Sequence, residues 1–416
     1  MRGELEASFR AALETTDPYA LTRRHLPEAT PALVLAVGKA AVPMARAAAD
    51  TCPDTPGLVV TRDGYGGPAG HFTVREAAHP VPDERSQAAA EEALELVGRR
   101  GAEDLVLVLV SGGGSSLLCA PWGIELEDKQ AVNQALLRSG APIGEINAVR
   151  KHLSRIKGGR LAAATQARIL TLVVSDVPGD DLAAVASGPT VPDPTTFADA
   201  LGVLDRHSLD LPAARAHLDR GAHGELPETL KPADPALSRV ENRLIGGGWQ
   251  LLEAAAGYWQ AHSKHHTVAS LSDRFSGEAR ELAHFHANLV QTIREHRAPF
   301  APPVVLLSGG EAGVTVRGDE LGGRNQEFLL WLAHDLGDDG VWALACDTDG
   351  IDGTTQAAGA IITPDTMTRA RARGLDPADS LQHNDAHRIF SELGDLIHTG
   401  PTRHNLNDYR AILVTA

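Results

Sequence analysis

Cysteine and long apolar runs are both scarce in this sequence, and each scarcity excludes a class of protein. Only three cysteines occur among 416 residues, at Cys52, Cys119 and Cys346, far apart in the chain. This spacing argues against a disulfide framework and is typical of reduced core cysteines in a cytoplasmic protein. The sequence has no run of about 18 apolar residues that could cross a membrane, and its N-terminus lacks the apolar segment of a signal peptide. We therefore expect a soluble, cytoplasmic protein without a membrane partner.

Positive charge is also in short supply. The formal net charge is −16 at pH 7, from 38 Lys and Arg against 54 Asp and Glu. A protein of this sign repels nucleic acid and anionic membranes, so neither is an expected partner. Only six of the basic residues are lysines. Lys39, Lys151 and Lys157 stand in or beside glycine-bearing motifs, where an ammonium can bind phosphate, whereas Lys129 is expected at an ordinary surface position.

Several short catalytic motifs are missing. The sequence contains no GxxxxGK[ST] phosphate loop, no GxSxG nucleophile elbow and no HExxH zinc motif. It also lacks a GxGxxG motif with an acidic residue about 20 positions later, which a dinucleotide site of Rossmann type requires. A nicotinamide dinucleotide site is therefore unsupported.

The most informative stretch that is present covers residues 105–120 and reads LVLVLVSGGGSSLLCA. Six consecutive Leu and Val residues predict a strand that is buried on both faces. Glycines let the backbone approach an anion, and the N–H groups at a helix start point toward it. We interpret the stretch as a cradle for phosphate or carboxylate, with a tight turn that binds nothing as the alternative. The glycine-rich loop after the strand consists of Ser111, Gly112, Gly113, Gly114, Ser115 and Ser116.

Two further segments repeat the pattern of buried strand followed by polar turn. Residues 32–37 predict a strand that leads through Gly38 and Lys39 into a helix over 40–49. Residues 169–174 predict another strand, with Asp176 just beyond its carboxyl end. Alternating strands and helices of this kind predict a Rossmann-like, doubly wound parallel sheet. Ligands of such sheets bind beyond the carboxyl ends of the strands, where Lys39, Ser111 and Asp176 all fall.

The chain is too long for one ordinary core, so its length predicts two or three domains. Residues 221–234 are the best candidate for a linker, and the strand and helix pattern restarts at residue 240. We place an N-terminal Rossmann-like domain at 1–237 and a smaller C-terminal α/β domain at 238–416. The expected elements of the second domain include strands at 304–307, 314–316, 341–346 and 411–414 and a helix at 325–336.

Three other groups of residues could carry chemistry. Arg324, in GGRNQE, opens the helix at 325–336, where its guanidinium could hold a phosphoryl group; a surface arginine is the alternative. The acidic run that contains Asp349 follows a predicted strand and could bind Mg²⁺ with a substrate phosphate, although a solvated acidic loop explains it equally well. A predicted helix over 143–161 carries a basic cluster that includes Arg150 and Lys157.

Long motifs in a fixed order give the sequence a resemblance to a known family. SGGGSSLL, EINAVRKHLSRIKGGRLA, SDVPGDDLAAVASGPTVPD, GGRNQE and DTDGIDGTTQAAGA are similar to motifs of the class II glycerate kinases, the glycerate 2-kinases with a C-terminal MOFRL domain. The resemblance covers nearly the whole chain. It implies ATP-dependent phosphorylation of D-glycerate to 2-phosphoglycerate, with an active site in the cleft between the two domains.

The resemblance also assigns roles to residues. It makes Lys39 and Arg324 the catalytic pair, and we expect the glycine-rich loop and Lys157 to bind nucleotide phosphates. Mg²⁺ would bridge the phosphates with Asp176, Asp180 or Asp349 as ligands. Further residues expected to contact the substrate or line the cleft are Asn147, Arg150, Asp176, Glu311, Asn325 and Asp349.

The sequence departs from the family pattern in two places and leaves two other functions open. Arg403 and His404 replace a Gly-Thr pair in the tail motif, and Ala312 and Gly313 follow Glu311 where threonines or a proline are usual. Both changes bear on substrate fit rather than on reaction class. The alternative functions are an NAD(P)H-dependent hydroxypyruvate reductase and a non-catalytic sensor of a sugar acid phosphate. A homodimer is a further expectation.

Overall fold

A computed structural model describes residues 1–263, 266–318, 320–337 and 339–415. The chain divides into two compact units, each built on a six-stranded sheet. The N-terminal unit comprises Pro18–Ser175 and Asp180–Ile245. The C-terminal unit comprises Met1–Asp17, Asp176–Gly179 and Gly246–Ala416.

The sheet of the N-terminal unit has the strand order β3-β2-β1-β4-β5-β6, and the five strands β1 to β5 pair in parallel. This confirms the doubly wound parallel sheet. The central strand β4 is buried along its whole length, as its run of Leu and Val predicts. The strands are β1 (Leu33–Val37), β2 (Gly57–Arg62), β3 (Thr73–Ala77), β4 (Leu105–Ser111), β5 (Arg168–Val174) and β6 (Val240–Gly246).

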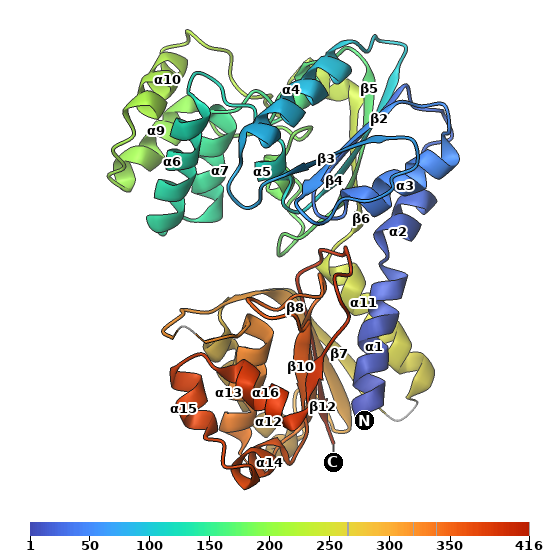
Figure 1. Cartoon of the computed structure of the whole chain (residues 1–416), viewed down its shortest axis with the longest axis vertical. Coiled ribbons are helices and arrows are strands. Elements are labelled where there is room, and N and C mark those ends of the chain that lie inside the picture. Colours follow the sequence, from blue (N-terminus) through green and yellow to red (C-terminus); the bar gives the residue numbers. More distant parts are fainter. Residues whose placement is uncertain (264–265, 319, 338, 416) are drawn as a thin grey trace. The chain divides into compact units, whose positions relative to one another are not determined.

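Helices cover this sheet, and four of them form a separate cluster. Helices α6, α7, α9 and α10 pack on one another beside the sheet, around a core that includes Val149, Phe197 and Leu218 (Figure 1). The long helix predicted over 143–161 is wrong, because α7 ends at His152 and left-handed Gly158 and Gly159 precede a separate short helix, α8. The helices are α2 (Pro18–His25), α3 (Ala41–Thr51), α4 (Glu84–Gly98), α5 (Gly114–Leu117), α6 (Leu126–Arg138), α7 (Ile143–His152), α8 (Arg160–Ala163), α9 (Phe197–Arg206) and α10 (Pro212–Ala222), with 3₁₀ turns η1 (Val185–Ser187) and η2 (Pro235–Arg239).

The sheet of the C-terminal unit is mixed, with the strand order β11-β10-β9-β12-β8-β7. Only β7 and β8 pair in parallel, and the other neighbours are antiparallel. The strand expected at 314–316 is absent, because β8 ends at Gly313 and those residues form a loop. The strands are β7 (Thr267–Glu278), β8 (Val304–Gly313), β9 (Trp342–Asp347), β10 (Gly359–Ile362), β11 (Leu396–Ile397) and β12 (Asp408–Val414).

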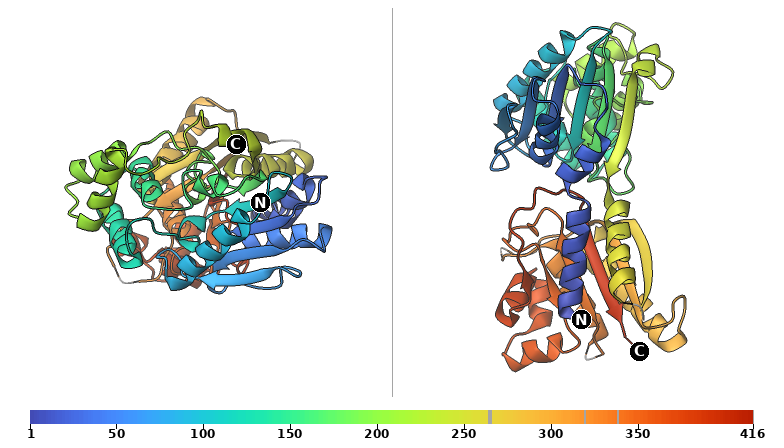
Figure 2. Two further views of the ribbon diagram at one scale, coloured as in Figure 1. Left: turned by 90° about the horizontal axis from the view of Figure 1, so that it is seen from above. Right: turned by 90° about the vertical axis from the view of Figure 1, so that its right-hand side faces the viewer.

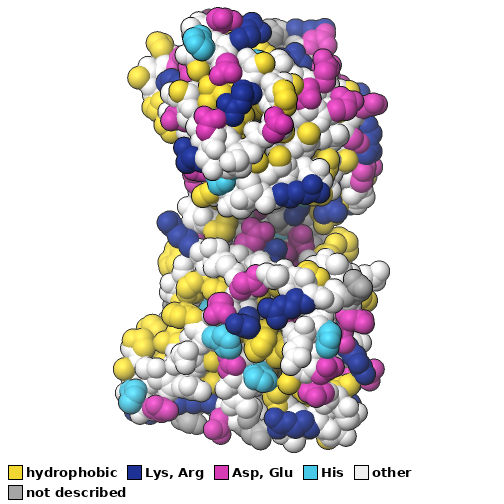
Figure 3. All heavy atoms as spheres, turned by 90° about the vertical axis from the view of Figure 1, so that its left-hand side faces the viewer, with side chains coloured by type: hydrophobic (Ala, Val, Ile, Leu, Met, Phe, Trp, Pro, Cys, Tyr) yellow, Lys and Arg dark blue, Asp and Glu magenta, His cyan; other side chains and the backbone are white. Residues whose placement is uncertain are grey.

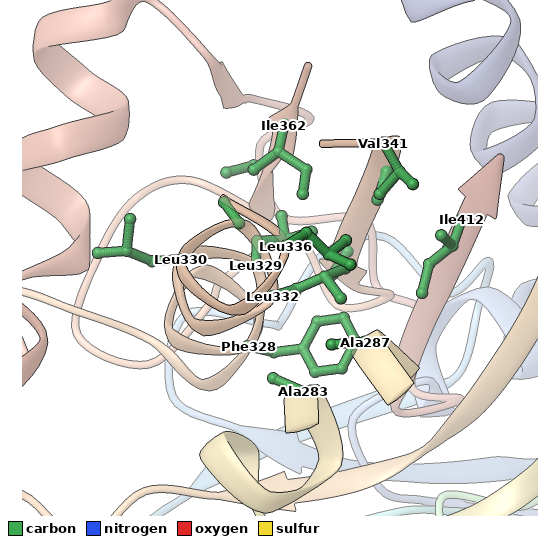
Figure 4. Close-up of a cluster of buried hydrophobic side chains, with 14 of the residues drawn as sticks. Ala283, Ala287, Phe328, Leu329, Leu330, Leu332, Leu336, Val341, Ile362 and Ile412 are labelled. Atoms are coloured by element: carbon green, nitrogen blue, oxygen red, sulfur yellow. The ribbon is translucent and has the colours of Figure 1, made fainter. Parts of the chain in front are cut away.

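Helix α13 lies at the centre of the C-terminal core. Phe328 of α13 faces Ala283 and Ala287 of α12, and Leu332 and Leu336 continue the same buried cluster (Figure 4). Helix α1 packs beside α11 in this unit (Figure 2). The helices are α1 (Arg2–Thr15), α11 (Gly248–His262), α12 (Ala279–His296), α13 (Arg324–Leu336), α14 (Thr366–Ala372), α15 (Pro377–Gln382) and α16 (Ala386–Leu393).

The grouping of contacts differs in three places from the expected boundary between residues 237 and 238, one of them being Asp176–Gly179, which group with the C-terminal unit. Strand β6 extends the first sheet beside β5, and helix α1 packs with the C-terminal elements. The expected linker at 221–234 lies within the N-terminal unit. The division into domains at 1–237 and 238–416 stays a prediction about independent folding.

Charged side chains of both signs are interspersed over the face drawn in Figure 3. In the described part of the chain, no helix combines the length and the apolar character needed to cross a membrane.

Candidate active site

Lys39 and the glycine-rich loop meet at the carboxyl edge of the first sheet. They follow β1 and β4, which are neighbouring parallel strands. The backbone N–H of Lys39 donates to the carbonyl of Gly112 (2.8 Å), and the N–H of Ala40 donates to Oγ of Ser111 (3.0 Å). Gly38 permits this approach, because a Cβ at its position would lie 2.2 Å from Oγ of Ser111. The sequence analysis placed both segments at one edge, and the structure brings them into direct contact.

Gly113 lies in the loop beside His79 and Lys39. Its φ of +81° is a left-handed conformation that favours glycine. A Cβ at this position would lie 3.1 Å from Nε2 of His79 and 3.5 Å from Cγ of Lys39. The side chains of Lys39 and His79 therefore both lie close to the loop backbone at Gly113. His79 lies in the connection between β3 and α4, where no sequence motif marked it as a site residue.

Lys157 supports the loop from within the protein. Its side chain is almost fully buried, and its ammonium donates to the carbonyls of Ser115 (2.6 Å) and Leu118 (3.3 Å). Burial lowers the pKa of Lys157 to about 8. These contacts place the ammonium against carbonyls of the loop and of the residues that follow it, and its expected contact with nucleotide phosphate stays a prediction.

A second segment, around Ser187, buttresses the loop and was missed in the sequence. Oγ of Ser187 lies 3.0 Å from Oγ of Ser115 and 3.3 Å from Oδ1 of Asn147. Ala186 and Ser187 both have positive φ values, 50° and 59°, which are unusual for residues with side chains. Such conformations persist only where surrounding contacts enforce them and they concentrate at functional sites. Asn147, an expected cleft residue, is thereby linked to the glycine-rich loop.

Arg150 and Lys129 have structural partners in the helical cluster. Nε of Arg150 donates to Oδ1 of Asn133 on α6 (2.9 Å). The ammonium of Lys129 is buried and donates to the carbonyls of Arg150 (2.9 Å) and Leu153 (3.1 Å). The expectation that Lys129 lies at the surface is therefore wrong, and burial lowers its pKa to about 7.

Arg324 is the centre of an ion-pair cluster in the C-terminal unit. Its Nε donates to Oδ1 of Asp408 (2.7 Å), its Nη2 to Oδ2 of Asp347 (2.7 Å), and its Nη1 to Oε1 of the half-exposed Glu311 (3.4 Å). Burial works against the charge of Arg324, but the three carboxylates raise its pKa above the ordinary value. The guanidinium stays charged and faces three carboxyl groups, with its longest contact to the most exposed one, Glu311.

Helix α13 is positioned by a buried aspartate. Oδ1 of Asp352 accepts from the N–H of Asn325 (3.0 Å), and Oδ2 accepts from the N–H (3.0 Å) and the Nε2 (2.9 Å) of Gln326. Asp352 thus satisfies N–H groups of the first helical turn. Asn325 also donates from Nδ2 to Oδ1 of Asp408 (2.9 Å), so this expected cleft residue belongs to the same cluster.

The candidate metal ligands do not come together into one carboxylate cluster. Among the described residues, no three His, Cys, Asp or Glu side chains are grouped so that they could hold a metal ion. Oδ2 of Asp176 accepts from Nδ2 of Asn405 (2.8 Å) in the C-terminal unit, whereas Asp180 belongs to the N-terminal unit. Oδ1 of Asp349 accepts from the N–H of Ile351 (2.9 Å).

Three of the residues that depart from the family pattern, Ala312, Arg403 and His404, have defined surroundings or backbone geometry in the structure. The backbone N–H of Ala312 donates to Oδ2 of Asp408 (3.0 Å), so this contact does not depend on its side chain. Arg403 has a φ of 60°. His404 is buried, and burial lowers its pKa to about 4.

A pocket of about 320 Å³ opens beside Arg324 within the C-terminal unit. Its walls include Val314, Val316, Thr354 and Glu327. Burial raises the pKa of Glu327 to about 6. The pocket gives small molecules access to the Arg324 cluster.

The doubly wound parallel sheet, with a glycine-rich loop at the carboxyl edge of its strands, places the N-terminal unit in the class of α/β folds that bind ligands at that edge. Comparisons with known proteins identify the family. The family described as "Domain of unknown function (DUF4147)" matches residues 4–219, and the MOFRL family matches residues 304–408. The chain belongs to this DUF4147/MOFRL family, the family of the glycerate 2-kinases, which confirms the resemblance seen in the sequence.

Relatives of known name cover nearly the whole chain. A glycerate 2-kinase of Pyrococcus horikoshii is 42% identical over 92% of this chain and 87% of its own. A protein of Agrobacterium vitis, provisionally named a hydroxypyruvate reductase, is 48% identical over 99% of this chain and 94% of its own. The crystal structure of a glycerate kinase from Thermotoga maritima superposes with a TM-score of 0.90 at 38% identity, covering 100% of this chain and 99% of that one.

Proposed function

We propose that this protein is a kinase that transfers the γ-phosphoryl group of ATP to the 2-hydroxyl of D-glycerate, forming 2-phosphoglycerate. The observation that carries the proposal is the contact between Lys39 and the glycine-rich loop. An ammonium beside a loop with open backbone is an arrangement that binds phosphate. Family relatives with kinase names support the same reaction.

The loop fits the phosphates of a nucleotide. Gly113 leaves the space that a Cβ would fill beside Lys39 and His79, so an anion can approach the backbone there. When bound, Mg-ATP would supply the phosphoryl group and a cation that neutralises phosphate charge. Mg²⁺ usually keeps several waters and takes only one or two protein carboxylates, so it needs no dense carboxylate cluster. Asp176, Asp180 and Asp349 stay our candidates for its direct or water-mediated ligands.

The chain's own residues would act by positioning and by charge neutralisation. Phosphoryl transfer requires little covalent chemistry from the protein and depends on stabilising negative charge. We assign this role to Lys39 and Arg324. Nη1 of Arg324 makes the longest of its three contacts, at 3.4 Å to the half-exposed Glu311. A phosphoryl oxygen could therefore replace Glu311 there while the two shorter contacts of Arg324 hold the guanidinium in place. Lys157 and Ser187 would keep the loop in its binding shape.

The second candidate function is reduction of hydroxypyruvate, which the name of the Agrobacterium vitis relative favours. Such a reductase needs a dinucleotide site. The loop after β4 has no GxGxxG spacing, and the turn after β1 carries a lysine where a pyrophosphate-binding turn has glycines. The kinase is therefore the function that the site supports best. A homodimer and a cytoplasmic location stay predictions.

A pair of assays on the purified protein tests the proposal. ADP formation from Mg-ATP is expected with D-glycerate, and NADH oxidation with hydroxypyruvate is expected to be absent. Lys39→Ala should lower kcat by roughly 10²- to 10⁴-fold, because it removes the charge beside the loop. Lys231→Ala, at a partly exposed position where the ammonium pairs with Glu228, is the control and should keep wild-type turnover. NADH oxidation without ADP formation would replace the kinase by the reductase.

A further inference from the structure

His79 lies near Lys39 and the glycine-rich loop of the N-terminal unit. It follows β3, the edge strand next to β2, so it joins Lys39 and the glycine-rich loop at the carboxyl edge of the sheet. The edge of its ring that carries Nε2 faces Gly113, at 3.1 Å from the position of a Cβ there. The ring is partly exposed, so a ligand in the loop can reach it.

The charges around His79 keep its ring neutral. Burial, together with the positive charges of Lys39 and Arg62, lowers its pKa to about 4. The acidic group on the adjoining segment is Asp83, whose Oδ1 accepts from the N–H of Ala78 (3.5 Å). Within the described part of the chain, the ring nitrogens of His79 have no hydrogen-bond partner. A neutral imidazole in this place therefore offers an available lone pair.

We propose that His79 is a catalytic residue that accepts the proton of the substrate hydroxyl during phosphoryl transfer. This inference rests on the proposed kinase function. The proton moves from the hydroxyl to the unprotonated ring nitrogen while the hydroxyl oxygen forms its bond to the γ-phosphorus. The bond between the γ-phosphorus and the β,γ-bridging oxygen breaks, and ADP leaves with that electron pair. The imidazolium afterwards releases the proton to water.

The position beside Lys39 couples the basicity of His79 to the phosphate. Without an anion, the ammonium of Lys39 opposes a second positive charge on the ring. A bound phosphate neutralises that ammonium, so protonation of His79 becomes more favourable when substrate is present. The residue is thus a weak base in the free protein and a stronger one in the loaded site. A histidine with a purely structural role would not need a position beside both Lys39 and the glycine-rich loop.

Kinetics of matched histidine variants test the proposal. His79→Gln keeps a polar side chain but removes the base, and kcat should fall by roughly 10²- to 10⁴-fold. KM values for ATP and D-glycerate should stay within about threefold, because binding contacts remain. The control is His71→Gln, on the connection between β2 and β3, whose Nε2 lies 2.6 Å from the carbonyl of Thr55; it should keep wild-type kcat. A His79→Gln protein with near wild-type kcat, or one impaired only in KM, overturns the proposal.

A spectroscopic titration gives a second readout that does not require turnover. The NMR signal of the His79 ring should titrate well below pH 6 in the free protein and at higher pH when pyrophosphate is added. An unchanged midpoint under saturating pyrophosphate contradicts the coupling between His79 and an anion at Lys39. Failure of the kinase function itself would appear differently, as a wild-type protein that forms no ADP with D-glycerate.

Discussion

Nε of Arg324 lies 2.7 Å from Oδ1 of Asp408, although the two residues are 84 positions apart. Asp408 begins β12 and Arg324 begins α13, so the pair fixes the start of the helix to the sheet. The buried carboxylate is also held by Arg410 and by the N–H of Ala312. Burial alone would raise the pKa of Asp408, but the guanidinium groups of Arg410 and Arg324 hold it below its ordinary value. The guanidinium of Arg324 is therefore held in one orientation before any ligand binds.

This orientation makes Arg324→Lys an informative substitution. Lysine keeps the positive charge but cannot make three directed contacts at once. We expect kcat to fall by roughly 10³- to 10⁵-fold, the range known for arginines that stabilise phosphoryl transfer. Arg388→Lys is the matched control, because Arg388 is exposed and its ion pair with Asp385 measures 3.9 Å. Equal turnover in both variants, measured by ADP release, would remove Arg324 from the mechanism.

A pair of glycine variants separates the effect of backbone strain on stability from the effect of a new side chain on activity at the proposed site. Gly113 and Gly140 have similar positive φ values, 81° and 71°, so alanine costs each about 1–2 kcal/mol in the free energy of unfolding. Only at Gly113 would the new Cβ crowd His79 and Lys39; at Gly140 it meets nothing within 4 Å. Gly113→Ala should lose most of its kinase activity, and Gly140→Ala should keep it. Chemical denaturation supplies the stability comparison, and equal activity losses would contradict the proposed site.

The buried ammonium of Lys157 predicts a pH dependence of stability. Burial lowers its pKa from 10.5 to about 8, so between these pH values the unfolded chain binds more protons than the folded one. The free energy of unfolding of the wild type should therefore rise with pH in this window, relative to Lys157→Met, by at most roughly 1.4 kcal/mol per pH unit. Urea denaturation at pH 7 to 10 measures the difference. Parallel curves for the two proteins would show that the ammonium is not buried as described.

Lys157→Met should also loosen the glycine-rich loop. Its ammonium donates to the carbonyls of Ser115 and Leu118, which a thioether cannot replace. We expect an increase in KM for ATP that exceeds the change in KM for D-glycerate. An unchanged KM for ATP in a folded variant would contradict the supporting role.

Asp352 connects helix stability to the arginine site. Asp352→Ala removes the acceptor for the N–H groups of Asn325 and Gln326 and should cost about 0.5–2 kcal/mol in the free energy of unfolding, as for other N-terminal caps. Asp376→Ala removes a comparable cap from α15, whose side chain accepts from Ala378 and Asp379. Both variants should be destabilised, but only Asp352→Ala should lose turnover. Thermal unfolding and the ADP assay together check this prediction.

The parts of the site that the sequence predicted are those that regular sheet geometry brings together. Lys39 and Ser111 follow adjacent parallel strands, so their meeting at one edge follows from strand order alone. Arg324 was recognisable because it opens a helix after two glycines. Its partner Asp408 could not be recognised from the sequence. The antiparallel pairing of β12 with β8 and β9 brings Asp408 to Arg324, and no local sequence pattern predicts that pairing.

Other misses have equally specific causes. The burial of Lys129 was missed because the carbonyls of Arg150 and Leu153, which satisfy its ammonium, become available only where α7 ends. His79 was not predicted as a site residue because β3, the strand before it, has several exposed residues and therefore lacks the apolar pattern of a buried strand. Without that strand, the sequence does not place His79 at the carboxyl edge of the sheet. Ser187 has a positive φ and lies in the segment that packs against the glycine-rich loop. Residue propensities describe local preference only, so they do not predict this conformation.

The central claim is phosphorylation of D-glycerate at its 2-hydroxyl, and the product of the reaction tests it most directly. The purified protein is incubated with Mg-ATP and D-glycerate, and the product is offered to enolase alone. We predict immediate conversion to phosphoenolpyruvate, because enolase accepts 2-phosphoglycerate. Product that enolase ignores until phosphoglycerate mutase is added would be 3-phosphoglycerate and would contradict the proposed regiochemistry, and no ADP formation at all would contradict the kinase function.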